Sequence, residues 1–188
     1  GVFGGPPCQG FSDLNRSLRA DGSHESTIYS LEMLDEFKRI VQQARPTWWL
    51  MENVRNVPDL IIEGYTWQRI DVRASEFGLN NRRLRHFQFG TLTGEQIVLP
   101  REDNGQRGPI AACKSGAPWS KYLERQGLPL DFDLPGMGRT AKKKAIGNAV
   151  AYPVALAIAN AIRYRVPAGT FDLCECDCLG VGLQGFTY

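Results

Sequence analysis

The chain has 188 residues, of which 43% are hydrophobic and 22% are charged, and its formal net charge is +2. This length and composition fit one α/β domain with a buried core and exclude a disordered chain. The apolar stretches are far shorter than the roughly 20 residues that cross a bilayer, and the five cysteines do not form a secreted disulfide framework. We therefore expect a cytoplasmic protein without a membrane partner.

The chain opens on a short apolar stretch that leads directly to a cysteine. Val2-Phe3-Gly4-Gly5 is followed by Pro6-Pro7-Cys8-Gln9-Gly10. Proline fixes its own φ and biases the preceding residue toward extended backbone, so the two prolines would hold Cys8 on a rigid turn at the end of a strand. Taken alone, Cys8 fits a small buried hydrophobe better than a nucleophile, because that is the commoner role of a single cysteine.

A helix and a second strand follow. Apolar residues recur at three-to-four-residue spacing over residues 26–44, which predicts an amphipathic helix that stops at Arg45-Pro46. Residues 47–51 form a β-prone apolar run that ends at Glu52. Strand, helix and strand make a βαβ unit with parallel strands, whose carboxyl ends share one edge of the sheet. If these strands are neighbours, about 5 Å apart, Cys8 and Glu52 meet at that edge.

The middle of the chain is basic and is interpreted as a hairpin-like region. Its arginines are Arg69, Arg73, Arg82, Arg83 and Arg85. Such a cluster suits phosphate contacts, although a solvated charged face is the alternative. Arg83 and Arg85 are two residues apart, and side chains two apart along a strand point to the same face of the sheet. On that face they could meet Cys8 and Glu52.

The last third of the chain shows less pattern. Residues 91–138 have no strong period beyond a candidate strand at 96–99, which predicts a loop-rich subdomain. Lysines at 142–144 suit phosphate contact and solvent equally well. Pro153 then lies in the first turn of an apolar helix that runs to about Tyr164.

Cys8 and Glu52 indicate a particular chemistry. They do not form the Cys-His pair of a thiol protease, because neither His24 nor His86 has an orienting partner that the sequence identifies. A thiolate that adds to C6 of an electron-poor ring such as a pyrimidine fits better, since addition makes C5 nucleophilic. Glu52 would hold a proton toward N3 if burial raises its pKa, while nearby arginine would stabilise the thiolate and anchor a phosphate. These roles need no metal.

Four motifs, in order, resemble those of the DNA cytosine-5 methyltransferases. They are residues 4–12 (Gly-Gly-Pro-Pro-Cys-Gln-Gly-Phe-Ser), 52–54 (Glu-Asn-Val), 81–85 (Asn-Arg-Arg-Leu-Arg) and 147–150 (Gly-Asn-Ala-Val). The resemblance implies an α/β fold, with a partial Rossmann-like methyltransferase core and a small loop-rich recognition subdomain. It also implies that the substrate is a cytosine flipped out of double-stranded DNA.

The resemblance assigns roles to individual residues. Cys8 would form the covalent adduct at C6, and Glu52 would bind N3 and the exocyclic amine. Arg83 and Arg85 would steady the adduct and the DNA backbone. The cofactor would be S-adenosyl-L-methionine, beside Asn148, Ala149 and Val150. A cognate restriction endonuclease is a candidate partner, in the cytoplasm of a bacterial or phage-infected cell.

The resemblance also divides the chain into parts. They are a catalytic part (residues 1–90), a short target-recognition-like segment (91–138), a helix returning to the core (139–165) and a cysteine-containing tail (166–188). Asn81 stands where the family usually has glutamine, and its shorter amide can still bond to the backbone. Cys174, Cys176 and Cys178 are spaced more closely than usual zinc ligands, which favours a frayed tail or a truncated metal knuckle.

The sequence lacks most of the expected cofactor site. No Gly-rich turn and no acidic residue for the cofactor's ribose precede Cys8. We therefore expect an amino-terminally truncated methyltransferase. The alternative is a catalytically incomplete DNA-binding or regulatory relative that keeps the Cys8 pocket.

Overall fold

The computed structural model describes residues 1–11, 25–102 and 117–165. Within these ranges the strands form one sheet in the order β1-β2-β4-β3. β1 (Val2–Gly4) pairs in parallel with β2 (Trp48–Asn53). β4 (Leu84–Thr91) pairs antiparallel with β2 and with β3 (Thr66–Arg73). The predicted parallel strand pair and the predicted basic hairpin are both confirmed.

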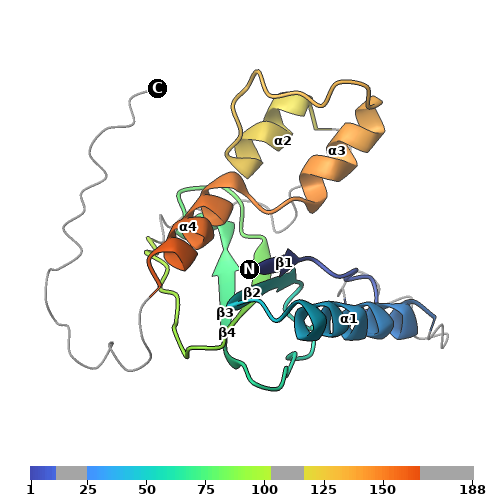
Figure 1. Ribbon diagram of the computed structural model, residues 1–188. Coiled ribbons are helices and arrows are strands. Elements are labelled where there is room, and N and C mark those ends of the chain that lie inside the picture. Colours follow the sequence, from blue (N-terminus) through green and yellow to red (C-terminus); the bar gives the residue numbers. More distant parts are fainter. Residues whose placement is uncertain (12–24, 103–116, 166–188) are drawn as a thin grey trace, which may run out of the picture.

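Helix α1 (Glu25–Ala44) covers one face of the sheet (Figure 1). Its buried residues Leu34, Phe37 and Val41 pack with Trp49 and Met51 of β2 in one hydrophobic cluster. Their three-to-four-residue spacing is the period that predicted this helix. The helix ends where Arg45 takes a positive φ of 44° ahead of Pro46, as the sequence indicated.

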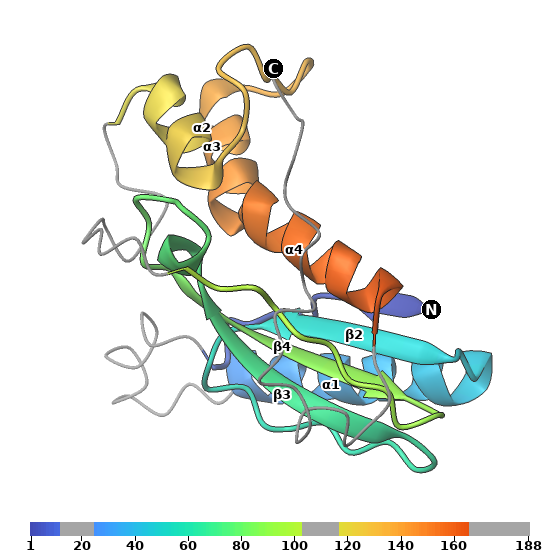
Figure 2. The ribbon, with the colours of Figure 1, turned by 90° about the vertical axis from the view of Figure 1, so that its left-hand side faces the viewer.

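Helix α4 (Tyr152–Arg163) covers the opposite face. Figure 2 shows the sheet between α4 and α1. Val154 and Ile158 of α4 belong to a second hydrophobic cluster, together with Leu50, Phe87 and Phe89 of the central strands β2 and β4. Proline occupies the first turn of α4, so the helix predicted from Pro153 is confirmed.

A small helical lobe extends from the sheet and contains α2 (Trp119–Gln126) and α3 (Arg139–Asn148). α2 was not predicted, because an eight-residue helix with few apolar positions leaves little periodic signal. It ends at Gly127, whose φ of 66° gives the left-handed cap that favours glycine. Among the described residues, no single helix has the length and apolar content to cross a membrane; α3 and α4 meet that test only together, as a pair bent by 41°.

The candidate strand at residues 96–99 is wrong, since no strand forms there. The backbone of this segment is instead bonded to a side chain of the sheet. Gln68 of β3 donates its amide to the carbonyl of Ile97 at 2.9 Å and accepts the amide N–H of Ile97 at 3.0 Å. Ile97 and Leu99 are therefore buried beside the sheet, whereas Val98 between them is exposed. A short 3-10 helix, η3 (Ala74–Glu76), follows β3.

The close approach of β4 to β2 leaves no room for a side chain at Gly90. A Cβ at this position would overlap the indole ring of Trp49, which is fully buried. We expect Gly90→Ala to lower the free energy of unfolding by about 2 kcal/mol, measured by urea denaturation. Trp49→Phe provides the matched background, because the indole N–H has no hydrogen-bond partner among the described residues and its loss breaks no bond. Gly90→Ala should cost less in that background, and an equal cost would contradict the overlap.

Candidate active site

The cysteine turn begins four residues after β1 and is held by backbone and side-chain bonds. The carbonyl of Cys8 accepts a hydrogen bond from the amide of Phe11 at 3.0 Å, which closes a tight turn. The amide of Gly10 donates to the hydroxyl of Ser30 on α1 at 3.0 Å, in a buried position. Cys8 itself is a half-buried free thiol. The turn is thus fixed to α1, and no sequence signal singled out Ser30 for this role.

A second tie joins the same segment to the end of β2. Asn53 donates its side-chain amide to the carbonyl of Pro6 at 3.0 Å, and its side-chain oxygen accepts the amide of Val54 at 2.8 Å. The neighbouring Glu52 carboxylate lies against Gly5, where an added Cβ would be 3.4 Å from Oε2. The structure therefore places Glu52 beside the segment that leads to Cys8, as the parallel strand pair predicted.

Glu52 pairs with Arg85. The Arg85 Nε and the Glu52 Oε1 are 3.0 Å apart, and the two side chains are only 20% and 18% exposed. Burial raises the pKa of the Glu52 carboxyl above its usual value, although the charges of Arg85 and Arg83 oppose that shift. Because desolvation is the larger influence, Glu52 can hold a proton at a higher pH than an exposed glutamate. This is the property that a general acid requires.

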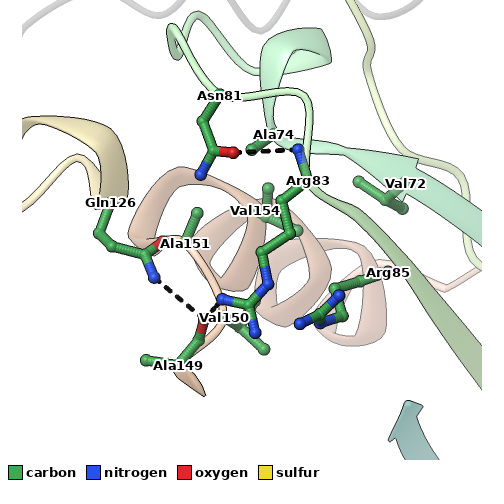
Figure 3. A pocket seen from close by; sticks show the side chains of 10 residues that line it. All are labelled: Val72, Ala74, Asn81, Arg83, Arg85, Gln126, Ala149, Val150, Ala151 and Val154. Carbon is green, nitrogen blue, oxygen red and sulfur yellow. Dashed lines mark hydrogen bonds between the residues drawn. The ribbon is translucent and has the colours of Figure 1, made fainter. Parts of the chain in front are cut away.

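Arg83 clamps the chain rather than facing an open site. Its guanidinium donates to the carbonyl of Ala149 at 2.9 Å and to that of Asn148 at 3.1 Å, at the carboxyl end of α3 (Figure 3). Gln126 of α2 also donates to the carbonyl of Ala149, at 3.2 Å. Arg83 therefore joins the start of β4 to the helical lobe.

Asn81 supports this clamp. Its side-chain oxygen accepts the amide of Arg83 at 3.0 Å, and its amide donates to the carbonyl of Arg125 at 3.1 Å. The expectation that this short amide still bonds to the backbone is confirmed.

Arg83 and Arg85 line one pocket together with Val150 and Val154, so both arginines do point to one face. The cavity measures only about 10 Å³, which is room for about one water molecule. Pockets that hold molecules of cofactor size measure roughly 300–1,000 Å³. The carbonyls of Asn148 and Ala149 are also already bonded to Arg83. This cavity alone is therefore too small for S-adenosylmethionine.

The remaining cysteines of the sequence, Cys113, Cys174, Cys176 and Cys178, lie outside the described residues. Within the described ranges, no group of three or more His, Cys, Asp or Glu side chains could hold a metal ion.

The described residues form an α/β sheet with a helix on each face, and the cysteine segment and the buried Glu52 carboxyl lie at the carboxyl ends of β1 and β2. Solved structures share this fold. The methyltransferase EhMeth of Entamoeba histolytica aligns with a TM-score of 0.53 at 13% identity, over 85% of this chain and 75% of that one. The Dnmt2 methyltransferase of S. pombe aligns with a TM-score of 0.50 at 11% identity, over 86% and 77%. At these identities the likeness shows the fold alone.

The sequence comparison establishes the family. The C-5 cytosine-specific DNA methylases match residues 1–112, more than half of the chain, and the chain belongs to this family. The family is a class of enzymes that act on DNA, and methyltransferases of this kind generally use S-adenosylmethionine.

Curated relatives include plant and bacterial proteins. DNA (cytosine-5)-methyltransferase 1A of Oryza sativa subsp. japonica is 31% identical over an alignment of 175 residues, and the match covers 77% of this chain and 11% of that protein. The type II methyltransferase M.AgeI of Thalassovita gelatinovora is 29% identical over an alignment of 124 residues, and the match covers 58% of this chain and 27% of that protein. The chain thus spans a minor part of the length of these relatives.

The raised pKa of Glu52 predicts a pH-dependent effect on stability. A carboxyl whose pKa is raised in the folded state contributes stability that is present at low pH and is lost as the pH rises through the folded pKa. Glu52→Gln removes this loss. We expect the free energy of unfolding of Glu52→Gln, relative to the wild type, to increase between about pH 4 and about pH 8.

The measurement is urea denaturation at several pH values. Glu32→Gln, on the exposed side of α1, is the matched control for the loss of a surface carboxyl. A Glu52→Gln difference that stays constant with pH, or that falls as the pH rises, would contradict the raised pKa.

Proposed function

We propose that this chain carries the nucleophile and the acid of a DNA cytosine-5 methyltransferase, which transfers a methyl group from S-adenosylmethionine to C5 of a flipped cytosine through a covalent bond from Cys8 to C6. The observation that carries the proposal is the position of Glu52. Its carboxylate lies against Gly5, in the segment that leads to Cys8, and burial raises its pKa. Membership of the family supports the proposal further.

The two oxygens of Glu52 are placed differently. Oε1 is held by Arg85, while Oε2 lies against Gly5. Arg85 therefore fixes the carboxyl while the Oε2 edge stays on the side of the cysteine segment. In the proposed reaction, protonated Glu52 donates toward N3 of the cytosine and accepts a hydrogen bond from the exocyclic amine. Arg85 is then a positioning group for the acid as well as a cation near the adduct.

The proposed cycle begins with attack by Cys8. The Cys8 thiolate forms the S–C6 bond, and the electron pair of the C5–C6 double bond moves to C5. When bound, S-adenosylmethionine supplies the methyl group that C5 receives. Transfer of the C5 proton to water, and return of the N3 proton to Glu52, then restore the C5–C6 double bond as the S–C6 bond breaks, which returns Cys8 as a thiolate.

We extend the proposal to the other parts of the chain. Residues 1–90 are the catalytic part, 91–138 the recognition segment, 139–165 the return to the core and 166–188 a tail. Arg83 steadies the carbonyls of Asn148 and Ala149, which with Val150 form the side nearest the cofactor. The substrate is double-stranded DNA in the cytoplasm of a bacterial or phage-infected cell, with a cognate restriction endonuclease as partner.

Covalent trapping tests the nucleophile. We expect the natural full-length protein to form a stable adduct with duplex DNA that contains 5-fluorocytosine, in the presence of S-adenosylmethionine, because fluorine at C5 blocks the final elimination. Cys8→Ser should reduce the adduct on a denaturing gel to background, and Cys113→Ser is the matched control for the loss of a thiol. An adduct that persists in Cys8→Ser would overturn the assignment. DNA binding without any adduct in the wild type would favour the non-enzymatic relative.

A further inference from the structure

A buried polar row crosses the sheet on the face that α1 covers. Asn53 of β2 is paired with His86 of β4, and His86 is paired with Asp71 of β3. By strand alternation, Asn53 shares its face with Trp49 and Met51, which pack against α1. Side chains directly opposite on antiparallel strands have Cβ atoms about 5 Å apart. The imidazole of His86 therefore lies between Asn53 and Asp71.

The surroundings of His86 fit the neutral ring. Its Nδ1 lies 3.2 Å from Oδ1 of Asp71, and since a carboxylate only accepts, Nδ1 carries the hydrogen. Its Nε2 is buried without a hydrogen-bond partner among the described residues, and the side chain is fully buried. Protonation would therefore bury a second N–H that has no acceptor, which is costly. The sequence identified no orienting partner for His86, and the structure places Asp71, 15 residues away in the chain, in that position.

Several charged groups surround this ring. Arg69 Nε and Arg55 Nε each lie 3.6 Å from a carboxylate oxygen of Asp71, and Arg69 also pairs with Asp59 at 2.5 Å. Burial of the ring, and then the charge of Arg69, lower the pKa of His86, while Asp71 and Asp59 oppose this shift. The row thus contains a histidine that is neutral at physiological pH and gains a proton only under acid conditions.

The row ends at the cysteine segment. Asn53, which is 2% exposed, donates the 3.0 Å hydrogen bond to the carbonyl of Pro6, two residues before Cys8. A change in the position of Asn53 would therefore move the turn that carries the thiol. His86 lies on the α1 face of the sheet, whereas Glu52 lies on the α4 face, so any effect of His86 on the chemistry passes through Asn53.

We propose that neutral His86 is a positioning residue that holds Asn53 against Pro6, and that its protonation releases the Cys8 turn. The proposal rests on the proposed function for its catalytic consequence. It gives the site a response to acid that is separate from the ionisation of Cys8 and of Glu52.

The test compares rates of adduct formation with 5-fluorocytosine DNA over about pH 5.5 to about pH 8.5. His86→Gln keeps a donor for Asp71 and does not titrate in this range. We expect its rate to stay within about threefold of the wild type at the alkaline end. At the acid end its rate should exceed the wild-type rate by less than about tenfold, because the pKa of His86 is lowered, and the excess should grow as the pH falls. The ratio of the two rates cancels the pH effects of Cys8 and Glu52, which both proteins share.

Asn53→Ala tests the route. We expect this variant to react about tenfold more slowly than the wild type at every pH, because the bond to Pro6 is lost. In that background, His86→Gln should no longer change the pH profile. A His86→Gln rate ratio that does not vary with pH, or the same pH-dependent ratio with and without Asn53, would overturn the proposal.

A second variant covers the case in which His86→Gln does not fold. Asp71→Asn removes a group that raises the pKa of His86, so the acid loss of rate should move to lower pH. An acid loss that stays in place, or moves to higher pH, would contradict the proposal.

Alkylation of Cys8 by iodoacetamide, followed by peptide mass spectrometry, separates this proposal from the proposed function. If wild-type protein forms no DNA adduct, the proposed function fails. The rates of Cys8 alkylation in His86→Gln and in the wild type still test whether His86 positions the turn. We expect the ratio of the two rates to vary with pH, and a ratio independent of pH would overturn the positioning role.

Discussion

The site depends on the pairing of β1 with β2. The parallel register aligns Phe3 with Leu50 and Gly4 with Met51, so the residues after Gly4 run beside the end of β2. Two features then follow from this pairing. The Asn53 amide reaches the carbonyl of Pro6, and the Glu52 carboxylate lies against Gly5, where the absence of a side chain leaves it room. A slip of one residue would turn Asn53 and Glu52 to the opposite faces and remove both contacts.

The arginines act at two places, and their different partners explain why the sequence pattern alone could not separate them. Arg85 pairs with a carboxyl that burial has made reluctant to ionise, and it offsets only part of that effect. Arg83 instead binds the carbonyls at the end of α3, where a cation also interacts favourably with the helix dipole, typically by about 0.3–1 kcal/mol. Since both side chains leave the chain at or just before the start of β4, this strand connects Glu52 to the helical lobe.

Much of this arrangement could be predicted from the sequence. The period of α1, its stop at Arg45-Pro46 and the apolar run of β2 are local signals, and the handedness rule for βαβ units brings Cys8 toward Glu52. Helix α2 and the Asp71–His86 contact could not be predicted in this way. The helix is short and mostly polar, and the contact depends on the register of the β3–β4 hairpin, which joins residues that are far apart in the chain.

Glu52 and Asn53 are neighbours in β2, but their side chains lie on opposite faces of the sheet and have different roles in the proposed site. The proposed general acid, Glu52, needs a pKa that burial can raise, and it lies on the α4 face, next to the hydrophobic cluster of Leu50 and Phe87. A nucleophile needs a fixed position, and Asn53 meets that need from the α1 face, where the polar row replaces the hydrophobic cluster. Because successive side chains of a strand point to opposite faces, the proton and the thiol are controlled from different environments. The acid can therefore be tuned by residues of the α4 side without disturbing the turn that carries Cys8, and the turn can be held or released by His86 without a change in the surroundings of Glu52.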